Sequence, residues 1–178
     1  GMFNSNNALT KLDLSNWQVG NVQDMGAMFA SCLNLTDLNV SNWDTRNVTS
    51  LFATFQDCQS LPTVDVSGWK TPKLTNLNQT FQRCYALTEL DPSGWDVSKV
   101  TNMMFMFRYC PKLAKLDVST WDTGNVTDMG AMFKGNYELE ELDVSNWDVS
   151  KVTTFANMFA SETQNAADMK LKKLDVSK

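Results

Sequence analysis

The chain has 178 residues, of which 43% are hydrophobic and 20% charged, and it carries a net charge of −5 with a pI near 4.7. This composition is typical of a folded domain, and no apolar run reaches the roughly 18 residues that a membrane-spanning helix needs, so no membrane insertion is expected. The acidic charge argues against nucleic acid or an anionic membrane as the main partner, because both attract clustered Lys and Arg.

Tryptophan recurs every 26 residues along the chain, at Trp17, Trp43, Trp69, Trp95, Trp121 and Trp147. A fixed period of this length indicates stacked units, none of which can bury its apolar face alone. Residues 1–178 contain no Pro-, Gly- or Ser-rich linker, so we expect one solenoid. Met2 and Phe3 precede Met28 and Phe29 by one period, which places the start of the chain inside a repeat. We therefore expect a segment of a longer protein with flanking domains.

Each repeat predicts a short strand followed by a helical segment. In Leu12-Asp13-Leu14 apolar and polar residues alternate, as in a strand with one buried face. From Val22 to Cys32 the apolar spacing changes to three and four, which predicts a short amphipathic helix or helical turn. The expected fold is an α/β solenoid of about seven 26-residue coils, with seven stacked parallel strands on the concave face and helical segments on the convex side.

Proline and an insertion mark departures from the repeat. Pro62 and Pro111 fit a strand start and a helix end, whereas Pro92 replaces a strand residue, removes a ladder donor and predicts a local irregularity. Six extra residues near 161–168 make residues 153–178 an atypical last repeat.

Two aromatic columns predict the core of the solenoid. Phenylalanine repeats beside tryptophan at Phe3, Phe29, Phe55, Phe81, Phe107, Phe133 and Phe159. Rings repeated in every coil are expected to point inward, and the alternative is an exposed sugar-binding platform.

A cysteine column, Cys32, Cys58, Cys84 and Cys110, lacks the spacing of metal or redox motifs. It predicts buried free thiols rather than disulfides, because stacked side chains point in parallel. The column becomes polar at Asn136 and Glu162. The chain has no histidine, which excludes Ser-His-Asp and Cys-His catalysis and most zinc sites.

The outward-facing strand residues are the candidate binding surface. They form two columns on the concave face: Lys11, Asp37, Thr63, Glu89, Lys115 and Glu141, and Asp13, Asn39, Asp65, Asp91, Asp117 and Asp143. Cross-strand ion pairing is the alternative to ligand recognition for the first column. For the second column, hydrogen bonds to the serines two residues on are expected, and calcium binding is the alternative. The N-x-T sequences at Asn34, Asn47, Asn78 and Asn125 are interpreted as turn and cap chemistry.

The motif L-x-x-L-x-L followed by N/K-V-T-x-M-x-x-M-F-x-x-C, as in LDVSTWDTGNVTDM at residues 116–129, resembles the BspA-like leucine-rich repeats of bacterial surface proteins. The resemblance covers the whole chain and implies a right-handed leucine-rich-repeat solenoid on an extracellular or cell-surface protein. It also implies a non-enzymatic adhesion module that binds an extracellular or host protein or a glycan. A spacer without a ligand of its own is the alternative. We expect no enzyme activity and no cofactor, because repeating Asp and Ser columns offer no single catalytic constellation.

Overall fold

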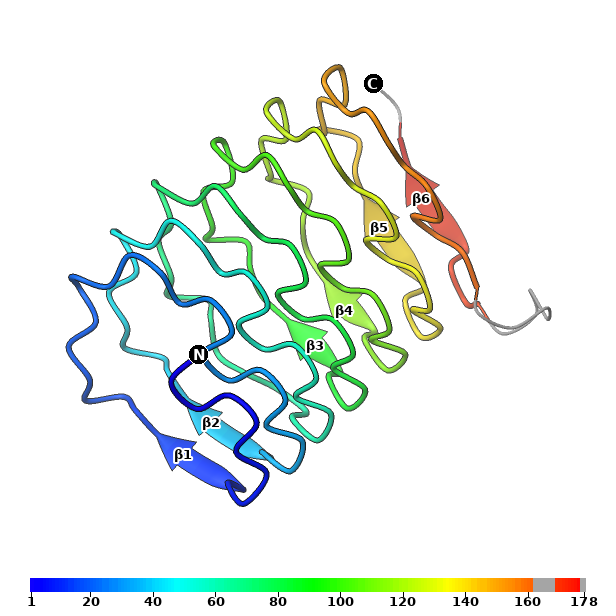
Figure 1. Cartoon of the computed structure of the whole chain (residues 1–178). Coiled ribbons are helices and arrows are strands. Elements are labelled where there is room, and N and C mark those ends of the chain that lie inside the picture. Colours follow the sequence, from blue (N-terminus) through cyan, green and yellow to red (C-terminus); the bar gives the residue numbers. More distant parts are fainter. Residues whose placement is uncertain (162–168, 177–178) are drawn as a thin grey trace.

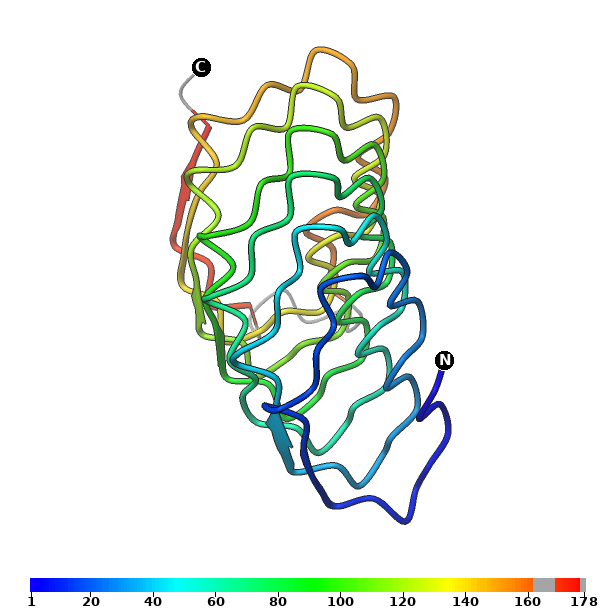
Figure 2. The ribbon, with the colours of Figure 1, turned by 90° about the vertical axis from the view of Figure 1, so that its left-hand side faces the viewer.

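Coils of 26 residues stack along one axis in the computed structural model, which describes residues 1–161 and 169–176 (Figure 1). The first and the last described residues lie toward opposite ends of the stack, and a view turned by 90° shows the coils as nested loops (Figure 2). We name each full coil after its tryptophan, from the Trp17 coil to the Trp147 coil. The solenoid predicted from the period is confirmed.

The strands are short and lie on one side of each coil, which we call the strand face. They are β1 (Lys11–Asp13), β2 (Asp37–Asn39), β3 (Glu89–Leu90), β4 (Lys115–Leu116), β5 (Glu141–Asp143) and β6 (Lys173–Asp175). They pair in parallel as β1–β2, β3–β4 and β5–β6. The expectation of seven continuously stacked strands is therefore wrong, because residues 63–65 of the Trp69 coil form no strand and the pairs do not join.

Two prolines interrupt the ladder on the strand face. Thr36 donates its backbone N–H and its hydroxyl to the carbonyl oxygen of Thr10, and Pro62, one period later, can donate neither. Pro62 was expected to suit a strand start, but the strand of its coil does not form. Pro92 replaces a residue like Leu14, whose N–H donates to the Asn39 carbonyl oxygen, and β3 ends at Leu90. The irregularity predicted at Pro92 is confirmed.

The predicted helical segment is wrong, since the described residues contain no helix. In the Trp17 coil, residues 25–32 form successive turns in which Met28, Ala30 and Cys32 donate to the carbonyl three residues earlier. The N–H groups between them donate to carbonyl oxygens of the next coil: Met25 to Ser50, Ala27 to Phe52, Phe29 to Thr54 and Ser31 to Gln56. We call this segment and its equivalents the turn ladder. It recurs through the stack, and a continuous column of bridges accompanies it: Asp24, Ser50, Asn76, Asn102, Asp128 and Thr154.

The turn ladder depends on two left-handed residues in each coil from the Trp17 coil to the Trp121 coil, and the described part of the Trp147 coil has one. In the Trp17 coil these are Ala27 and Ser31, with φ of 51° and 57°, and the later coils repeat them at Ala53, Asp57, Gln79, Arg83, Phe105, Tyr109, Ala131, Gly135 and Asn157. This conformation breaks a helix and aims alternate N–H groups at the neighbouring coil. An apolar spacing of three and four also fits these turns, which is why the sequence pattern suggested a helix.

Both aromatic columns lie in the core. Trp43, Trp69, Trp95, Trp121 and Trp147 are buried, as are the phenylalanines from Phe29 to Phe133. Neighbouring phenylalanine rings stack with centroids 5.0–5.8 Å apart. Each buried indole donates its Nε1–H to a carbonyl of the preceding coil, for example Trp69 to Val40 at 3.3 Å. The inward-facing interpretation is confirmed, and only Trp17 in the first coil is 38% exposed.

Replacing Trp69 with Ala should lower the free energy of unfolding by about 3–5 kcal/mol, because a large cavity forms and the Val40 carbonyl loses a partner. Chemical denaturation followed by circular dichroism measures the loss. Trp17→Ala is the matched control and should cost clearly less, since Trp17 is already partly exposed. Equal losses would contradict the assignment of the tryptophan column to the core.

Substitutions at Ala53 distinguish the turn ladder from a helix. Ala53→Gly should change stability by less than about 1 kcal/mol, because relief of the left-handed conformation offsets lost burial and added chain entropy. Ala53→Val should cost about 2 kcal/mol or more, because a β-branched residue fits this conformation poorly and Ala53 is buried. In a helix glycine would be the worse substitution, so a reversed order of the two melting temperatures would refute the turn ladder.

Candidate functional site

The strand face presents the twelve candidate binding residues to solvent. All are exposed except Asn39, which is half-buried. Three cross-strand ion pairs join this face: Lys11 with Asp37 at 3.6 Å, Lys115 with Glu89 at 3.5 Å, and Lys173 with Glu141 at 4.0 Å. Cross-strand pairing is thus confirmed at these positions. Because all six side chains are solvated, each pair adds little to stability.

The aspartate column forms hydrogen bonds within each coil rather than between coils. The Oδ1 atom of Asp117 accepts from the backbone N–H of Ser119 at 3.0 Å and from its hydroxyl at 2.7 Å. Hydrogen bonds from the following serine, side chain and backbone, lower the pKa of Asp91 and of Asp143. The expected hydrogen bonds between each aspartate and the serine two residues on are confirmed. Among the described residues no group of three or more Cys, Asp or Glu side chains is arranged to hold a metal ion.

A groove of about 670 Å³ crosses the strand face where the strand pairing is interrupted. Half of the candidate residues line it, from the Trp69, Trp95 and Trp121 coils: Thr63, Asp65, Glu89, Asp91, Lys115 and Asp117. Four of these side chains are acidic and one is basic, so the groove is negatively charged. Val64, Leu90 and Leu116 add apolar lining.

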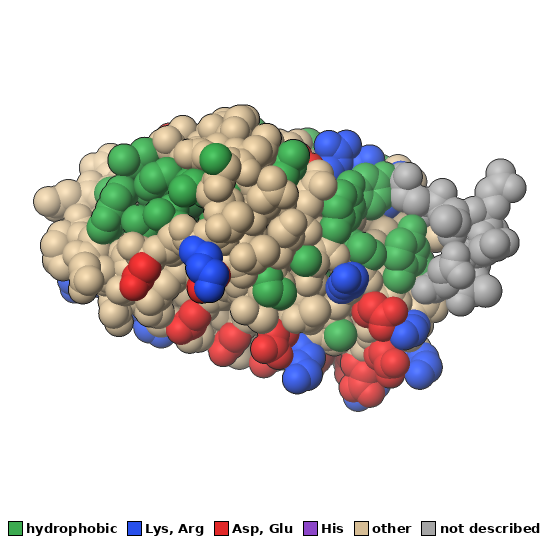
Figure 3. Space-filling model, turned by 90° about the horizontal axis from the view of Figure 1, so that it is seen from below, with side chains coloured by type: hydrophobic (Ala, Val, Ile, Leu, Met, Phe, Trp, Pro, Cys, Tyr) green, Lys and Arg blue, Asp and Glu red, His purple; other side chains and the backbone are tan. Residues whose placement is uncertain are grey.

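A second hollow, of about 320 Å³, continues along the strand face and is lined by Asp117, Glu141 and Asp143 among others. The remaining candidates, Lys11, Asp13, Asp37 and Asn39, lie on the paired strands β1 and β2 and line neither hollow. Seen from below, acidic and basic side chains follow one another along the molecule (Figure 3). The structure therefore brings eight of the twelve predicted residues together around the two hollows.

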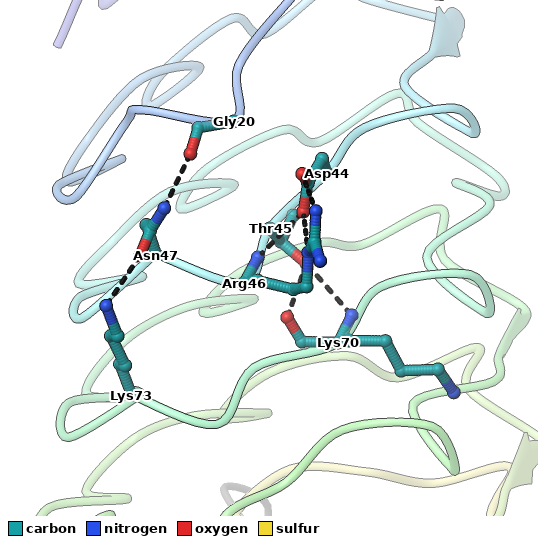
Figure 4. A network of polar contacts seen from close by, with 7 residues as sticks. All are labelled: Gly20, Asp44, Thr45, Arg46, Asn47, Lys70 and Lys73. Carbon is teal, nitrogen blue, oxygen red and sulfur yellow. Dashed lines mark hydrogen bonds and ion pairs between the residues drawn. The ribbon is translucent and has the colours of Figure 1, made fainter.

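The asparagines of two N-x-T sequences are occupied by contacts between coils. The Asn47 amide donates to the Gly20 carbonyl oxygen at 2.8 Å, and its Oδ1 accepts from Lys73 at 2.6 Å (Figure 4). Asn125 repeats this arrangement with Ser98 and Lys151. Both asparagines lie in turns, as expected, but their side chains join neighbouring coils and cap no helix.

The neighbouring polar contacts in Figure 4 also serve the scaffold. The buried Thr45 hydroxyl accepts from the Lys70 N–H and donates to the Lys70 carbonyl oxygen, both at 2.9 Å. Hydrogen bonds from Arg46 lower the pKa of Asp44 to about 2. These residues fix one coil on the next and offer no reactive group.

The four cysteines are buried free thiols, as predicted. Each thiol donates to a phenylalanine carbonyl of the preceding coil, for example Cys58 to Phe29 at 3.2 Å. Burial raises the pKa of Cys58 and of Cys84 well above the usual range. The column becomes polar at the buried Asn136, whose Oδ1 accepts from the Cys110 N–H, and the next position, Glu162, lies outside the described residues, as does most of the six-residue insertion.

A thiol reagent should label none of the four cysteines in the folded protein at pH 8, because all four are buried and burial also raises the pKa of Cys58 and of Cys84. All four should react in denaturant. The absorbance of the chromophore that the reagent releases gives the number of reactive thiols in the folded and in the unfolded protein. Fewer than four thiols after unfolding without reductant would instead indicate disulfides.

The structure also shows a notch that the sequence analysis missed. Tyr85, Tyr109, Pro111, Gly135 and Tyr137 line a depression of about 220 Å³. All three tyrosines of the chain are among these residues. Tyrosine occurs in no other coil, so the appearance of tyrosine in these three coils is the sequence feature that could have indicated the notch.

The repeated ladders and the two surface hollows define a solenoid repeat protein with an enclosed aromatic core. The chain belongs to the family described as "Mycoplasma protein of unknown function, DUF285", whose pattern matches residues 1–92 and 86–178. A search of curated proteins finds no match.

Among solved structures, an internalin (inlF) from Listeria monocytogenes is similar over 95% of this chain and 87% of that one. The two are 10% identical with a TM-score of 0.22, a likeness too slight to bear on function. No helix in the described ranges is long and apolar enough to cross a membrane.

Proposed function

We propose that this chain is a non-enzymatic interaction module of a bacterial surface protein, which binds a protein or glycan on its strand face. The observation that carries the proposal is the groove lined by Thr63, Asp65, Glu89, Asp91, Lys115 and Asp117. Solenoids commonly bind partners on the surface formed by their strands. Three of the groove residues, Thr63, Glu89 and Lys115, belong to the column that varies from coil to coil, whereas the repeated aromatic side chains lie in the core.

The chemistry of the groove favours a partner with positive charge or many hydroxyl groups. The lining carries four carboxylates, one ammonium and several apolar side chains. The resemblance of the repeats to BspA-like leucine-rich repeats supports an extracellular location and an adhesive role. The family match supports a repeat protein.

A spacer that holds other domains apart is the second candidate function. It is favoured by the three cross-strand ion pairs, which give the charges of the strand face a partner within the chain. Ligand binding depends on the position of each charge on the strand face, whereas a spacer function does not. The ion pairs therefore provide a direct test.

Swapping the charges within two pairs distinguishes recognition from spacing. One variant combines Glu89→Lys with Lys115→Glu and Glu141→Lys with Lys173→Glu, so net charge and pairing are retained. We expect an unchanged melting temperature, because the exposed pairs are worth about 0.2–1 kcal/mol each in either order. We expect at least about tenfold weaker binding to partners found by screening matrix proteins and glycans.

The control swaps Lys11 and Asp37, which form an ion pair outside both hollows, and it should retain binding. A strand face that recognises a ligand must respond to the first swap and not to the second. If both variants adhere like the unmodified protein, or no partner is found for it, the spacer function replaces the proposal.

A further inference from the structure

The tyrosine notch lies apart from the strand-face groove and shares none of its lining residues. Two of its walls come from one column, in which Tyr85, Pro111 and Tyr137 occupy successive coils. Proline is smaller than tyrosine, so Pro111 leaves a space between Tyr85 and Tyr137, and this space is the notch. Phe81, Phe107 and Phe133 mark the same coils with centroids 5.8 and 5.7 Å apart, so the two tyrosine positions lie about 11 Å apart.

Gly135 makes room for the third tyrosine. A Cβ atom at this position would lie 2.5 Å from Cδ1 of Tyr109. The equivalent positions in other coils hold Ser31, Asp57 and Arg83 with positive φ, so the backbone does not require glycine here. The absence of a side chain at Gly135 is therefore explained by the placement of the Tyr109 ring.

The notch offers ring surfaces and hydroxyl groups that the fold does not use. Tyr85 is 39% exposed, and Tyr137 is half-buried. Within the described residues neither of these two hydroxyls has a hydrogen-bond partner. Tyrosine supplies rigid contact area with an apolar face and a polar end, at a small cost in conformational entropy. Such a surface suits a ligand that is itself apolar on one side and hydroxylated at its rim.

Basic side chains surround Tyr109 in an otherwise acidic protein. The Arg108 guanidinium lies 4.5 Å from the centre of the Tyr109 ring, and the Lys134 ammonium lies 6.0 Å from it. Arg108 Nη2 donates to the Tyr109 hydroxyl, whereas its Nε–H has no hydrogen-bond partner. Arg108 is not one of the residues that line the notch, but it lies beside the Tyr109 ring that does. Because its Nε atom is buried, its Nη groups are the donors that a carboxylate at the edge of the notch would meet.

We propose that the notch binds one sugar ring that carries a carboxylate, such as a uronic or sialic acid residue. A volume of about 220 Å³ is smaller than the 300–1,000 Å³ of typical ligand pockets and suits a single ring. The sugar's C–H groups lie against the tyrosine rings, whose faces are negatively polarised, its hydroxyls bond to Tyr85 and Tyr137, and its carboxylate faces Arg108. An acidic peptide shares the charge but not the flat, hydroxylated ring.

Titration calorimetry and saturation-transfer NMR with defined sugars test the proposal. Trigalacturonate and sialyllactose should bind with dissociation constants of about 0.1–1 mM. The neutral maltotriose and lactose should bind at least tenfold more weakly. The galacturonate and sialyl arms show which carboxylated ring fits better. Hexaglutamate, the peptide counterpart, should neither bind at the notch nor compete.

Four variants locate the binding. Tyr85→Leu and Gly135→Ser should each weaken binding of the carboxylated sugars about tenfold, the second by displacing the Tyr109 ring. Arg108→Gln should abolish the preference for carboxylated over neutral sugars. Tyr137→Phe keeps the ring, lacks the hydroxyl and should show an intermediate, several-fold loss. Phe52→Leu, a change at another exposed aromatic residue, is the control and should bind normally.

The proposal is overturned if neither carboxylated sugar binds, if neutral sugars bind equally well, or if Tyr85→Leu leaves binding unchanged in a folded protein. Competition by hexaglutamate would replace it with a peptide site. These outcomes are separable from those on the strand face, because the charge swaps there leave the notch residues intact.

Discussion

The turn ladder is the constraint on which the rest of this structure depends. From the Trp17 coil to the Trp121 coil, four N–H groups of each coil bond to the next coil, and nearly all of the N–H groups between them close turns within their own coil. This alternation requires two residues with positive φ, each of which costs about 1–2 kcal/mol when it is not glycine. Leaving four buried N–H groups without partners would cost about 1–3 kcal/mol each. The hydrogen bonds therefore outweigh the backbone strain, even with side chains as large as Phe105 and Tyr109 at the left-handed positions.

Several of the repeated polar side chains donate hydrogen bonds from one coil to backbone carbonyl oxygens of the coil before it. The Thr75 hydroxyl and N–H both donate to the Thr49 carbonyl oxygen, and the Cys58 thiol and Trp69 indole bond back in the same direction. A carbonyl oxygen can accept two hydrogen bonds, so these side chains use acceptor capacity that the backbone leaves free. The threonine, the cysteine and the tryptophan thus share one physical role. Each donates to a carbonyl oxygen of the preceding coil.

The sequence predicted what depends on side-chain identity and missed what depends on the backbone. Column alignment located the core, the free thiols, the Asp–Ser pairs and the charged strand face. The helix prediction failed because apolar residues at positions such as Met25, Met28, Phe29 and Cys32 suit both a helix and a series of turns. Ala27 has a left-handed backbone conformation, although alanine is the strongest helix former. The residue type at this position therefore gave no sign that a helix could not form. The groove and the notch could not be predicted, since each depends on how neighbouring coils fit together around one exceptional residue.

The strand-face groove and the tyrosine notch each occur where a repeated element is missing. Pro62 lacks the N–H that would join its coil to the Trp43 coil on the strand face, and the groove is lined in part by the next residues of that coil. Gly135 lacks the side chain that the equivalent positions carry, and Tyr109 occupies the space. The inward aromatic positions have little freedom to vary, because each ring stacks on its copies in the neighbouring coils. Outward positions can vary, yet a regular column of them produces only an even surface. A distinct site in such a solenoid therefore arises where a hydrogen bond of the ladder or a side chain of a column is missing. Proline removes the hydrogen bond and glycine removes the side chain with little disturbance to the coils on either side.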